Sequence, residues 1–437
     1  MRPESTVAYV SSYPPRACGI ATFTRNLSDA VAASGRNLGT RIAAITDEGA
    51  SYDYPPQVRW NIDQCDPESW RQAAREINAS RASLVSIQHE FGIHGRFEKD
   101  GSFVDHLKSF LECIEKPVVS TLHTVLPHPR PDLREAIRTL HDHSSAVVTM
   151  VNMARLILEQ EYDLDSNKLF TIPHGVPSVR WMPPDRLKHA MQFEDRTILS
   201  TFGLLSSGKG IQYVIRGLPD VVKHHPDVLY LVIGQTHPEV RRREGEKYRN
   251  SLIELVKRLH LENHVRFVNQ YLTQQQLIRY LQATDIYLTP YVGRYQITSG
   301  TLAYALGCGK PVISSPYLYA SEALAEGRGL MAEFQNPRSF GRCIRLLLEN
   351  PGMRELCERS AFEYGKEMSW ANVGGRYADL YRDAAGLSSV EVKGSNVRDI
   401  VPVKDALTAK AAAFVDEHAP TEHHEPAGAK LSWAASL

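Results

Sequence analysis

The sequence has no excess of charge of either sign, because 50 lysines and arginines balance 50 aspartates and glutamates in 437 residues. A balanced chain lacks the basic field that draws proteins to nucleic acid or anionic lipid, so we expect no nucleic-acid partner. The first residues also lack the long apolar run of a signal peptide or membrane anchor. We therefore expect a cytoplasmic protein without a transmembrane segment.

Signatures of several enzyme classes are missing as well. The six cysteines form no Cys-x-x-Cys pair and the histidines have no zinc-ligand spacing, so we expect reduced thiols and no metal site. No Gly-x-Gly-x-x-Gly loop follows the first predicted strand, and no Gly-x-Ser-x-Gly elbow occurs. These absences argue against a nicotinamide-dependent dehydrogenase and against acyl transfer.

The chain does contain a repeated alternation of short segments rich in Val, Ile and Thr with longer amphipathic segments. This pattern predicts βαβ units with parallel sheets, and the length allows two domains. The predicted fold class is therefore α/β, with two doubly wound Rossmann-like domains facing a cleft. Strands are predicted near residues 6–10, 41–45, 84–87, 118–121, 146–150 and 169–172, and then near 197–202, 229–233, 265–268, 286–288 and 311–314.

A proline-rich stretch between the two series of strands predicts a linker. We expect a first domain at residues 1–180, a linker at 181–196 and a second domain at 197–368. From residue 387 to 437 the alternation stops and the composition shifts to Ala, Ser, Pro, His and mixed charge, which predicts a disordered tail.

Three loops are candidate ligand sites, because ligands bind outside the carboxyl ends of parallel strands. The first loop runs from Ser11 to Thr22, before a predicted helix, and contains Gly19, and the second runs from Gly203 to Gly210 and contains Lys209. A lysine with backbone N–H groups can grip a diphosphate, and the Ser or Thr that holds Mg²⁺ in a Walker A loop is absent here. The third, Gln296-Ile297-Thr298-Ser299-Gly300-Thr301, predicts a capped helix start. Each of the three also fits an ordinary structural turn or cap.

Together these loops resemble the retaining, nucleotide-sugar-dependent glycosyltransferases of family 4, which have the two-domain GT-B fold. The resemblance covers about residues 7–384 and includes Thr121-Leu122-His123, Ile172-Pro173-His174-Gly175-Val176 and Ala305-Leu306-Gly307-Cys308-Gly309-Lys310-Pro311. It implies that the first domain takes the acceptor and the second binds the nucleotide sugar. It also implies that a helix at 369–386, which starts at Ser369-Trp370, crosses back and packs on the first domain.

The resemblance assigns roles to single residues. His123 lies beside the transferred sugar, and Lys209 lies on the donor diphosphate in the same loop as Gly203. Gly19 belongs to the glycine loop that faces the diphosphate and the acceptor. The distal phosphate is bound at the helix start by Ser299, Gly300 and Thr301.

The chain departs from the family at the positions of its two hallmark glutamates, which are Gln296 and Tyr304 here, and Leu204 replaces an arginine of the diphosphate loop. Gln296 can still hydrogen-bond to sugar hydroxyls, and Tyr304 can hydrogen-bond or stack, but neither carries a charge. Arg294 is a candidate to restore positive charge on the diphosphate. We assign His123, Lys209 and Gln296 as candidate catalytic residues.

Two further positions are candidates. His89-Glu90 directly follows a predicted strand, where it could orient an acceptor hydroxyl or serve as an ordinary structural pair. Glu322 matches a family segment at the rim of the donor site, where it could supply a carboxylate.

These features predict a hexosyltransferase that moves a hexosyl group, such as mannosyl or glucosyl, from a nucleoside diphosphate sugar to an acceptor hydroxyl with retention of configuration. The expected partners are the sugar donor and a carbohydrate or other hydroxyl acceptor, with no cofactor and no metal. One alternative is a catalytically silent GT-B protein that binds nucleotide sugars or glycans. Another is a GT-B enzyme of a different reaction, such as a phosphorylase or a sugar-nucleotide epimerase.

Overall fold

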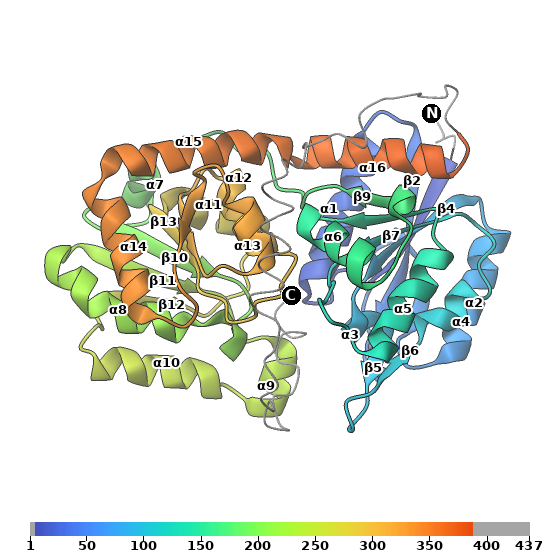
Figure 1. Ribbon diagram of the computed structural model, residues 1–437, viewed down its shortest axis with the longest axis horizontal. Helices are drawn as coiled ribbons and strands as arrows, with labels where there is room; N and C mark the ends of the chain where they lie inside the picture. The colour runs from blue at the N-terminus through green and yellow to red at the C-terminus, as the bar shows by residue number, and fades with distance from the viewer. Residues whose placement is uncertain (1–4, 388–437) are drawn as a thin grey trace. The chain divides into compact units, whose positions relative to one another are not determined.

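The computed structural model describes residues 5–387, which form two α/β units (Figure 1). Of the described residues, unit 1 contains 5–175 and 370–387, whereas unit 2 contains 176–369. The predicted tail lies, from residue 388 onward, outside the described residues.

Unit 1 is built on a seven-stranded parallel sheet with the strand order β3-β2-β1-β4-β7-β8-β9, and a short antiparallel pair, β5-β6, lies apart from it. Its strands are β1 (Ser5–Ser11), β2 (Leu38–Thr46), β3 (Val58–Asp63), β4 (Ala82–His89), β5 (Gly95–Phe97), β6 (Phe103–Asp105), β7 (Val118–Leu122), β8 (Ala146–Thr149) and β9 (Leu169–Thr171). Its helices are α1 (Gly19–Ala33), α2 (Pro67–Ala79), α3 (Phe91–His94), α4 (Leu107–Leu111), α5 (Pro131–Asp142), α6 (Asn152–Glu161), the 3-10 turn η1 (Ser166–Lys168) and α16 (Trp370–Ala384).

The last helix, α16, belongs to the core of unit 1. Its residues Val373, Tyr377 and Tyr381 are buried with the side chains of α1 and the central strands. The helix lies close to α1, because a Cβ atom added at Gly374 would be 2.6 Å from the Cβ of Ala30. Residues 370–384 therefore pack on the first unit, as the motif after Ser369 implied.

Unit 2 repeats the architecture on a six-stranded parallel sheet with the order β12-β11-β10-β13-β14-β15. Its strands are β10 (Thr197–Phe202), β11 (Val228–Ile233), β12 (Val265–Val268), β13 (Ile286–Thr289), β14 (Val312–Ser314) and β15 (Gly329–Met331). Its helices are α7 (Asp185–Ala190), the 3-10 turn η2 (Ser207–Lys209), α8 (Ile211–His224), α9 (Pro238–Glu244), α10 (Lys247–Arg258), α11 (Gln274–Ala283), α12 (Gly300–Gly307), α13 (Leu318–Ala323), α14 (Pro337–Glu349) and α15 (Pro351–Glu367).

The segment 181–196, which the sequence predicted as a linker, contains helix α7 and is part of unit 2. The Lys188 ammonium of this helix lies 2.7 Å from the carboxylate of Asp285, and both side chains are buried. An ion pair removed from water in this way fixes α7 against the sheet. The proline content of the segment did not predict this attachment to unit 2, because the residue that anchors α7, Asp285, is distant in the sequence.

The α/β fold class and its two Rossmann-like halves are confirmed by the two parallel sheets. In each sheet the strand order reverses at one point, between β1 and β4 in unit 1 and between β10 and β13 in unit 2. Ligands of doubly wound sheets bind outside the carboxyl ends of the strands at such a reversal. The loops that follow these four strands are therefore the candidate ligand-binding loops.

Candidate functional site

In unit 2 the loops that follow β10 and β13 are in close contact. Gly210 has φ +63°, and a Cβ atom added there would lie 1.9 Å from the carbonyl oxygen of Pro290. The Val292 N–H also donates to the Gly208 carbonyl at 3.1 Å. Only glycine permits both the left-handed backbone and this approach, so the loop that carries Lys209 is fixed against the loop after β13.

Lys209 is 4% exposed, and its ammonium donates to the Tyr291 hydroxyl at 3.1 Å and lies 4.1 Å from the centroid of that ring. The same hydroxyl pairs with the Thr301 Oγ1 at 2.6 Å. A Cβ atom added at Gly203, where φ is +135°, would be 3.3 Å from the Thr301 Cγ2 and 3.8 Å from the Lys209 Nζ. Three predicted donor-site residues, Gly203, Lys209 and Thr301, therefore meet around Tyr291, which the sequence analysis missed.

The start of α12 is capped by Ser299, whose Oγ accepts from the Leu302 N–H at 3.3 Å. The Ser299 Oγ also lies 3.3 Å from the Thr301 Oγ1, and the Ser299 side chain is buried. Gly300 is the first residue of the helix. The first turn of a helix carries unpaired N–H groups, which form the positive end of the helix dipole. An anion beside Thr301 and Lys209 would therefore be stabilised by the helix end and by the Lys209 ammonium.

The replaced hallmark positions have local partners. The Gln296 amide donates to the Thr298 carbonyl at 2.8 Å, and Tyr304 is buried with its ring 6.4 Å from that of Phe202. The exposed Arg294 guanidinium lies over the Phe334 ring, 4.5 Å from its centroid. This contact holds the side chain without a phosphate, so the assignment of Arg294 to the diphosphate stays a prediction.

Glu322 lies in α13, which begins against the loop that contains Gln296. The Leu318 and Tyr319 N–H groups at the start of this helix donate to the Arg294 and Gln296 carbonyls at 3.1 and 3.0 Å. The helix therefore borders the predicted donor loop, and the role of the Glu322 carboxylate at a rim stays a prediction.

In unit 1, His123 directly follows β7 and is 3% exposed. Its Nε2 lies 3.1 Å from the Gln88 Oε1, and the Gln88 amide in turn donates to Ser86 at 3.2 Å and Thr121 at 3.5 Å. Because an amide oxygen only accepts, Nε2 carries the proton and Nδ1 is left as an acceptor. Burial lowers the pKa of His123 to about 3, so the ring is neutral at pH 7.

A second buried polar group lies at the end of β4. The Glu90 Oε2 accepts from the Thr124 hydroxyl at 2.6 Å, and Oε1 has no partner among residues 5–387. Burial raises the pKa of Glu90 to about 7, against smaller lowering effects of Thr124 and of backbone N–H groups. His89 and His94 lie on either side in sequence, with ring centroids 5.2 Å apart, and burial lowers the pKa of both. The predicted pair His89-Glu90 thus belongs to a larger buried cluster that includes His94. A hydrogen bond from the His123 N–H to the His89 carbonyl, at 3.0 Å, joins this cluster to the loop of His123.

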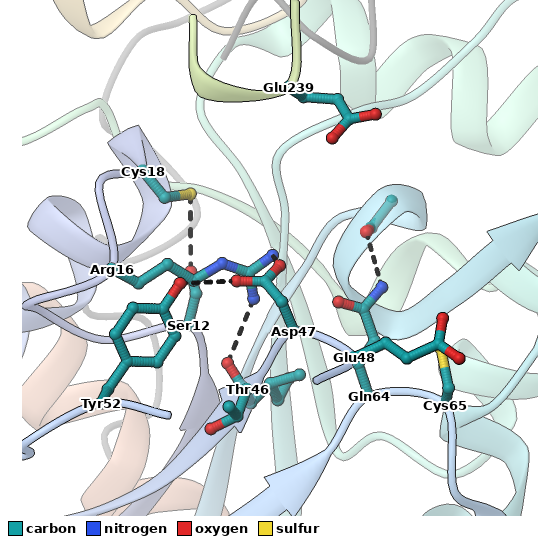
Figure 2. Close-up of polar contacts among 12 residues, drawn as sticks. Ser12, Arg16, Cys18, Thr46, Asp47, Glu48, Tyr52, Gln64, Cys65 and Glu239 are labelled. Carbon is teal, nitrogen blue, oxygen red and sulfur yellow. Dashed lines mark hydrogen bonds and ion pairs between the residues drawn. The ribbon is translucent and has the colours of Figure 1, made fainter. Parts of the chain in front are cut away.

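The same sheet edge contains a polar cluster that sequence reasoning missed (Figure 2). Arg16, in the loop that ends at Gly19, forms an ion pair with Asp47 and donates to the Ile45 carbonyl at 3.1 Å. The Tyr52 hydroxyl donates to Asp47 at 2.8 Å. Arg16 follows β1 and Asp47 follows β2, and these two strands are adjacent and parallel. This placement was the sequence signal from which the pair could have been predicted. The cluster fixes the loop before α1 and presents polar groups at its surface.

Residues 5–387 contain no group of three or more His, Cys, Asp or Glu side chains arranged to hold a metal ion. None of the helices in this range combines the length and the apolar character that a bilayer span requires.

Comparisons with known proteins agree with this geometry. Residues 186–364, which contain the Lys209 and Thr301 loops, match the model of the family described as glycosyl transferases group 1. The spore coat protein SA of Bacillus subtilis is 23% identical over 258 residues, or 55% of this chain and 65% of that protein. The D-inositol 3-phosphate glycosyltransferase of a Nocardioides species is 23% identical over 300 residues, or 61% and 62%. The chain thus spans a little under two thirds of the length of these relatives.

Among solved structures, Anabaena HepE in complex with UDP superposes with a TM-score of 0.65 at 15% identity, over 86% of this chain and all of that one. Likeness at this identity concerns the fold. Residues 186–364 thus match the group 1 glycosyl transferases, and the likeness to solved structures shows that the chain has a GT-B fold.

Proposed function

We propose that the protein is a retaining hexosyltransferase that moves a hexosyl group from a nucleoside diphosphate sugar to a hydroxyl of an acceptor. The observation that supports this most directly is the convergence of Lys209, Tyr291 and Thr301 at the reversal point of the second sheet. A buried ammonium beside a helix start suits a diphosphate better than it suits an apolar core.

In this proposal the diphosphate is the leaving group, and its charge grows as the bond to the sugar breaks. The Lys209 ammonium and the N–H groups at the start of α12 stabilise that charge, and they are already in place before the reaction. The acceptor oxygen bonds to the anomeric carbon on the face that the diphosphate leaves and gives its proton to the departing phosphate oxygen, so the configuration is retained. We assign no metal to this step, because lysine and backbone N–H groups supply the positive charge.

From unit 1 we assign His123 to the transferred sugar. A neutral imidazole whose Nδ1 is an acceptor can accept a hydrogen bond from a sugar hydroxyl. Because it is uncharged, it does not repel the positive charge that develops on the sugar ring. Glu90 and His89 are assigned to the acceptor hydroxyl, since the Glu90 carboxyl has an oxygen available to accept.

The test is nucleoside diphosphate release with a panel of UDP- and GDP-hexoses and a set of sugar and polyol acceptors. We expect Lys209→Ala and His123→Ala to lose turnover by more than about a hundredfold. His106→Ala is the matched control, because His106 is also buried in unit 1 with one ring hydrogen bond, to the Gln64 carbonyl at 2.7 Å. Near-normal transfer in either site variant would refute the assignment, and an inverted anomeric product in the NMR spectrum would refute retention.

A second candidate function is favoured by Gln296 and Tyr304, which leave the donor loops without the two carboxylates of the family. A catalytically silent protein that binds nucleotide sugars would keep the Lys209 loop and need neither glutamate. Tight binding of a nucleoside diphosphate sugar with no turnover across the whole panel would establish this candidate instead.

A further inference from the structure

Unit 2 contains a cavity of about 320 Å³ that no part of the proposed reaction uses. Its lining residues are Gln235, Thr236, Pro238, Arg241 and Arg242, from the loop after β11 and from α9. The volume is at the lower end of the range for small-molecule sites. We name it the Arg241 cavity.

The Arg241 cavity adjoins the loop that carries Lys209. Leu205 forms a parallel bridge with Thr236, in which its N–H donates to the Gln235 carbonyl at 2.9 Å and its carbonyl accepts from the His237 N–H at 3.0 Å. Burial, and then the charge of Lys209, lower the pKa of His237 to about 4. The cavity and Lys209 thus lie in neighbouring loops, which follow the adjacent strands β11 and β10.

The cavity region has a local excess of positive charge in a chain that is neutral overall. Between residues 235 and 249 the cations are Arg241, Arg242, Arg243, Lys247 and Arg249, whereas the anions are Glu239, Glu244 and Glu246. The helix α9 is too short to contribute a dipole, so this charge comes from side chains.

The two lining arginines are held only by exposed ion pairs. Arg242 pairs with Glu239 at 2.8 and 3.0 Å, and the Arg241 Nε lies 3.4 Å from Glu246, with the arginine side chains 76% and 68% exposed. Exposed pairs of this kind are worth little, so both guanidinium groups can turn to a stronger anion at small cost. A phosphate offers a guanidinium two parallel hydrogen bonds.

A buried guanidinium that is not fully paired is connected to the lining residue Thr236 through Glu246. Glu246 accepts hydrogen bonds from Thr236 and Arg249, and Arg249 also donates to the Gly234 carbonyl at 2.7 Å. Arg249 is 4% exposed, and its Nη1 has no partner within the described chain. A cation buried with an unused donor adds positive potential to the region.

We propose that the Arg241 cavity binds the phosphate group of a phosphorylated sugar or polyol, separate from the donor diphosphate. This identification of the ligand rests on the proposed function, whereas the anion site itself does not. Arg241 and Arg242 bind the phosphate, the Gln235 amide offers a further hydrogen bond, and Lys209 remains with the donor.

The test is calorimetric titration of the full chain with glucose 6-phosphate, with glucose and with UDP. The titrations with glucose 6-phosphate and glucose are each done in the absence and in the presence of saturating UDP. We expect the wild type to bind glucose 6-phosphate and to bind glucose at least about tenfold more weakly. The double variant Arg241→Ala/Arg242→Ala should lose about tenfold or more in affinity for glucose 6-phosphate and keep its affinity for UDP. Arg243→Ala is the matched control, because Arg243 is adjacent and also contacts Glu239, at 3.8 Å, but does not line the cavity.

Three results would overturn the proposal: equal binding of glucose and glucose 6-phosphate by the wild type under both conditions, unchanged glucose 6-phosphate affinity in the double variant, or an equal loss in Arg243→Ala. A parallel loss of UDP affinity in the double variant would also overturn it, because the cavity would then hold the donor diphosphate. Failure of the wild type to bind any nucleoside diphosphate would refute the proposed function and leave the glucose 6-phosphate comparison intact.

Discussion

Replacement of Tyr291 by phenylalanine removes one hydroxyl from the centre of the donor site and leaves the ring in place. The hydroxyl accepts from the Lys209 ammonium at 3.1 Å and pairs with Thr301 at 2.6 Å. A hydrogen bond to a charged group contributes about 1.5–3 kcal/mol and a neutral one about 0.5–1.5 kcal/mol. Because Lys209 keeps its contact with the ring, we expect the free energy of unfolding to fall by about 1–3 kcal/mol.

The same change should weaken diphosphate binding by about three- to tenfold, since Lys209 and the start of α12 lose the group that links them. Urea unfolding and UDP or GDP titration measure the two effects. Tyr230→Phe is the matched control, because it removes a comparable buried hydroxyl, which pairs with Thr201 at 2.7 Å in the same unit. The reasoning is refuted if Tyr291→Phe binds the nucleotide as the wild type does, or if Tyr230→Phe loses as much affinity.

Three further changes test the structure around the sites. Gly210→Ala should lower the free energy of unfolding in urea by about 3 kcal/mol or more, because the new Cβ would meet the Pro290 carbonyl. Gly327→Ala is the control, with φ +78° and no atom within 4 Å of the new Cβ, and should lower it by about 1 kcal/mol. Equal losses of stability in the two variants would contradict the close approach at Gly210. Glu90 has a raised pKa, so the folded protein binds its proton more strongly than the unfolded chain does, and stability is lost as pH rises from about 4.5 to about 7. Glu90→Gln should therefore gain up to about 3 kcal/mol relative to the wild type between pH 5 and pH 8, and a pH-independent difference would contradict the burial argument. Lys188→Met should lose about 3–5 kcal/mol in urea unfolding by leaving a buried carboxylate unpaired, and an unchanged midpoint would show that α7 is not anchored by this pair.

The sequence predicted the fold where strands are long and apolar, as in β1, β4, β10 and β11. It missed β3, whose alternating polar residues Arg59, Asn61 and Asp63 suit an edge strand, and β15, which has only three residues. A long apolar run in the sequence is a clear signal of a buried strand. The alternating pattern of an edge strand can be recognised as a strand only after the neighbouring strand is known.

The candidate site shows the same limit. Lys209 and the Ser299-Gly300-Thr301 start could be predicted, because glycine turns and caps are local signals in the chain. Tyr291 could not, since its role depends on the contact between two loops about 80 residues apart. The Arg16–Asp47 pair also depends on strand order, which only the folded sheet reveals.

The central claim is that Lys209 binds the donor diphosphate, and the most direct test is the affinity of Lys209→Met for UDP and GDP beside that of the wild type. Methionine keeps the apolar stem and removes the charge, so the loss should equal that of a charge-assisted hydrogen bond, about 10- to 150-fold in affinity, with adenosine and uridine unaffected. A Lys209→Met protein that remains folded and binds the nucleoside diphosphate as tightly as the wild type would contradict the account.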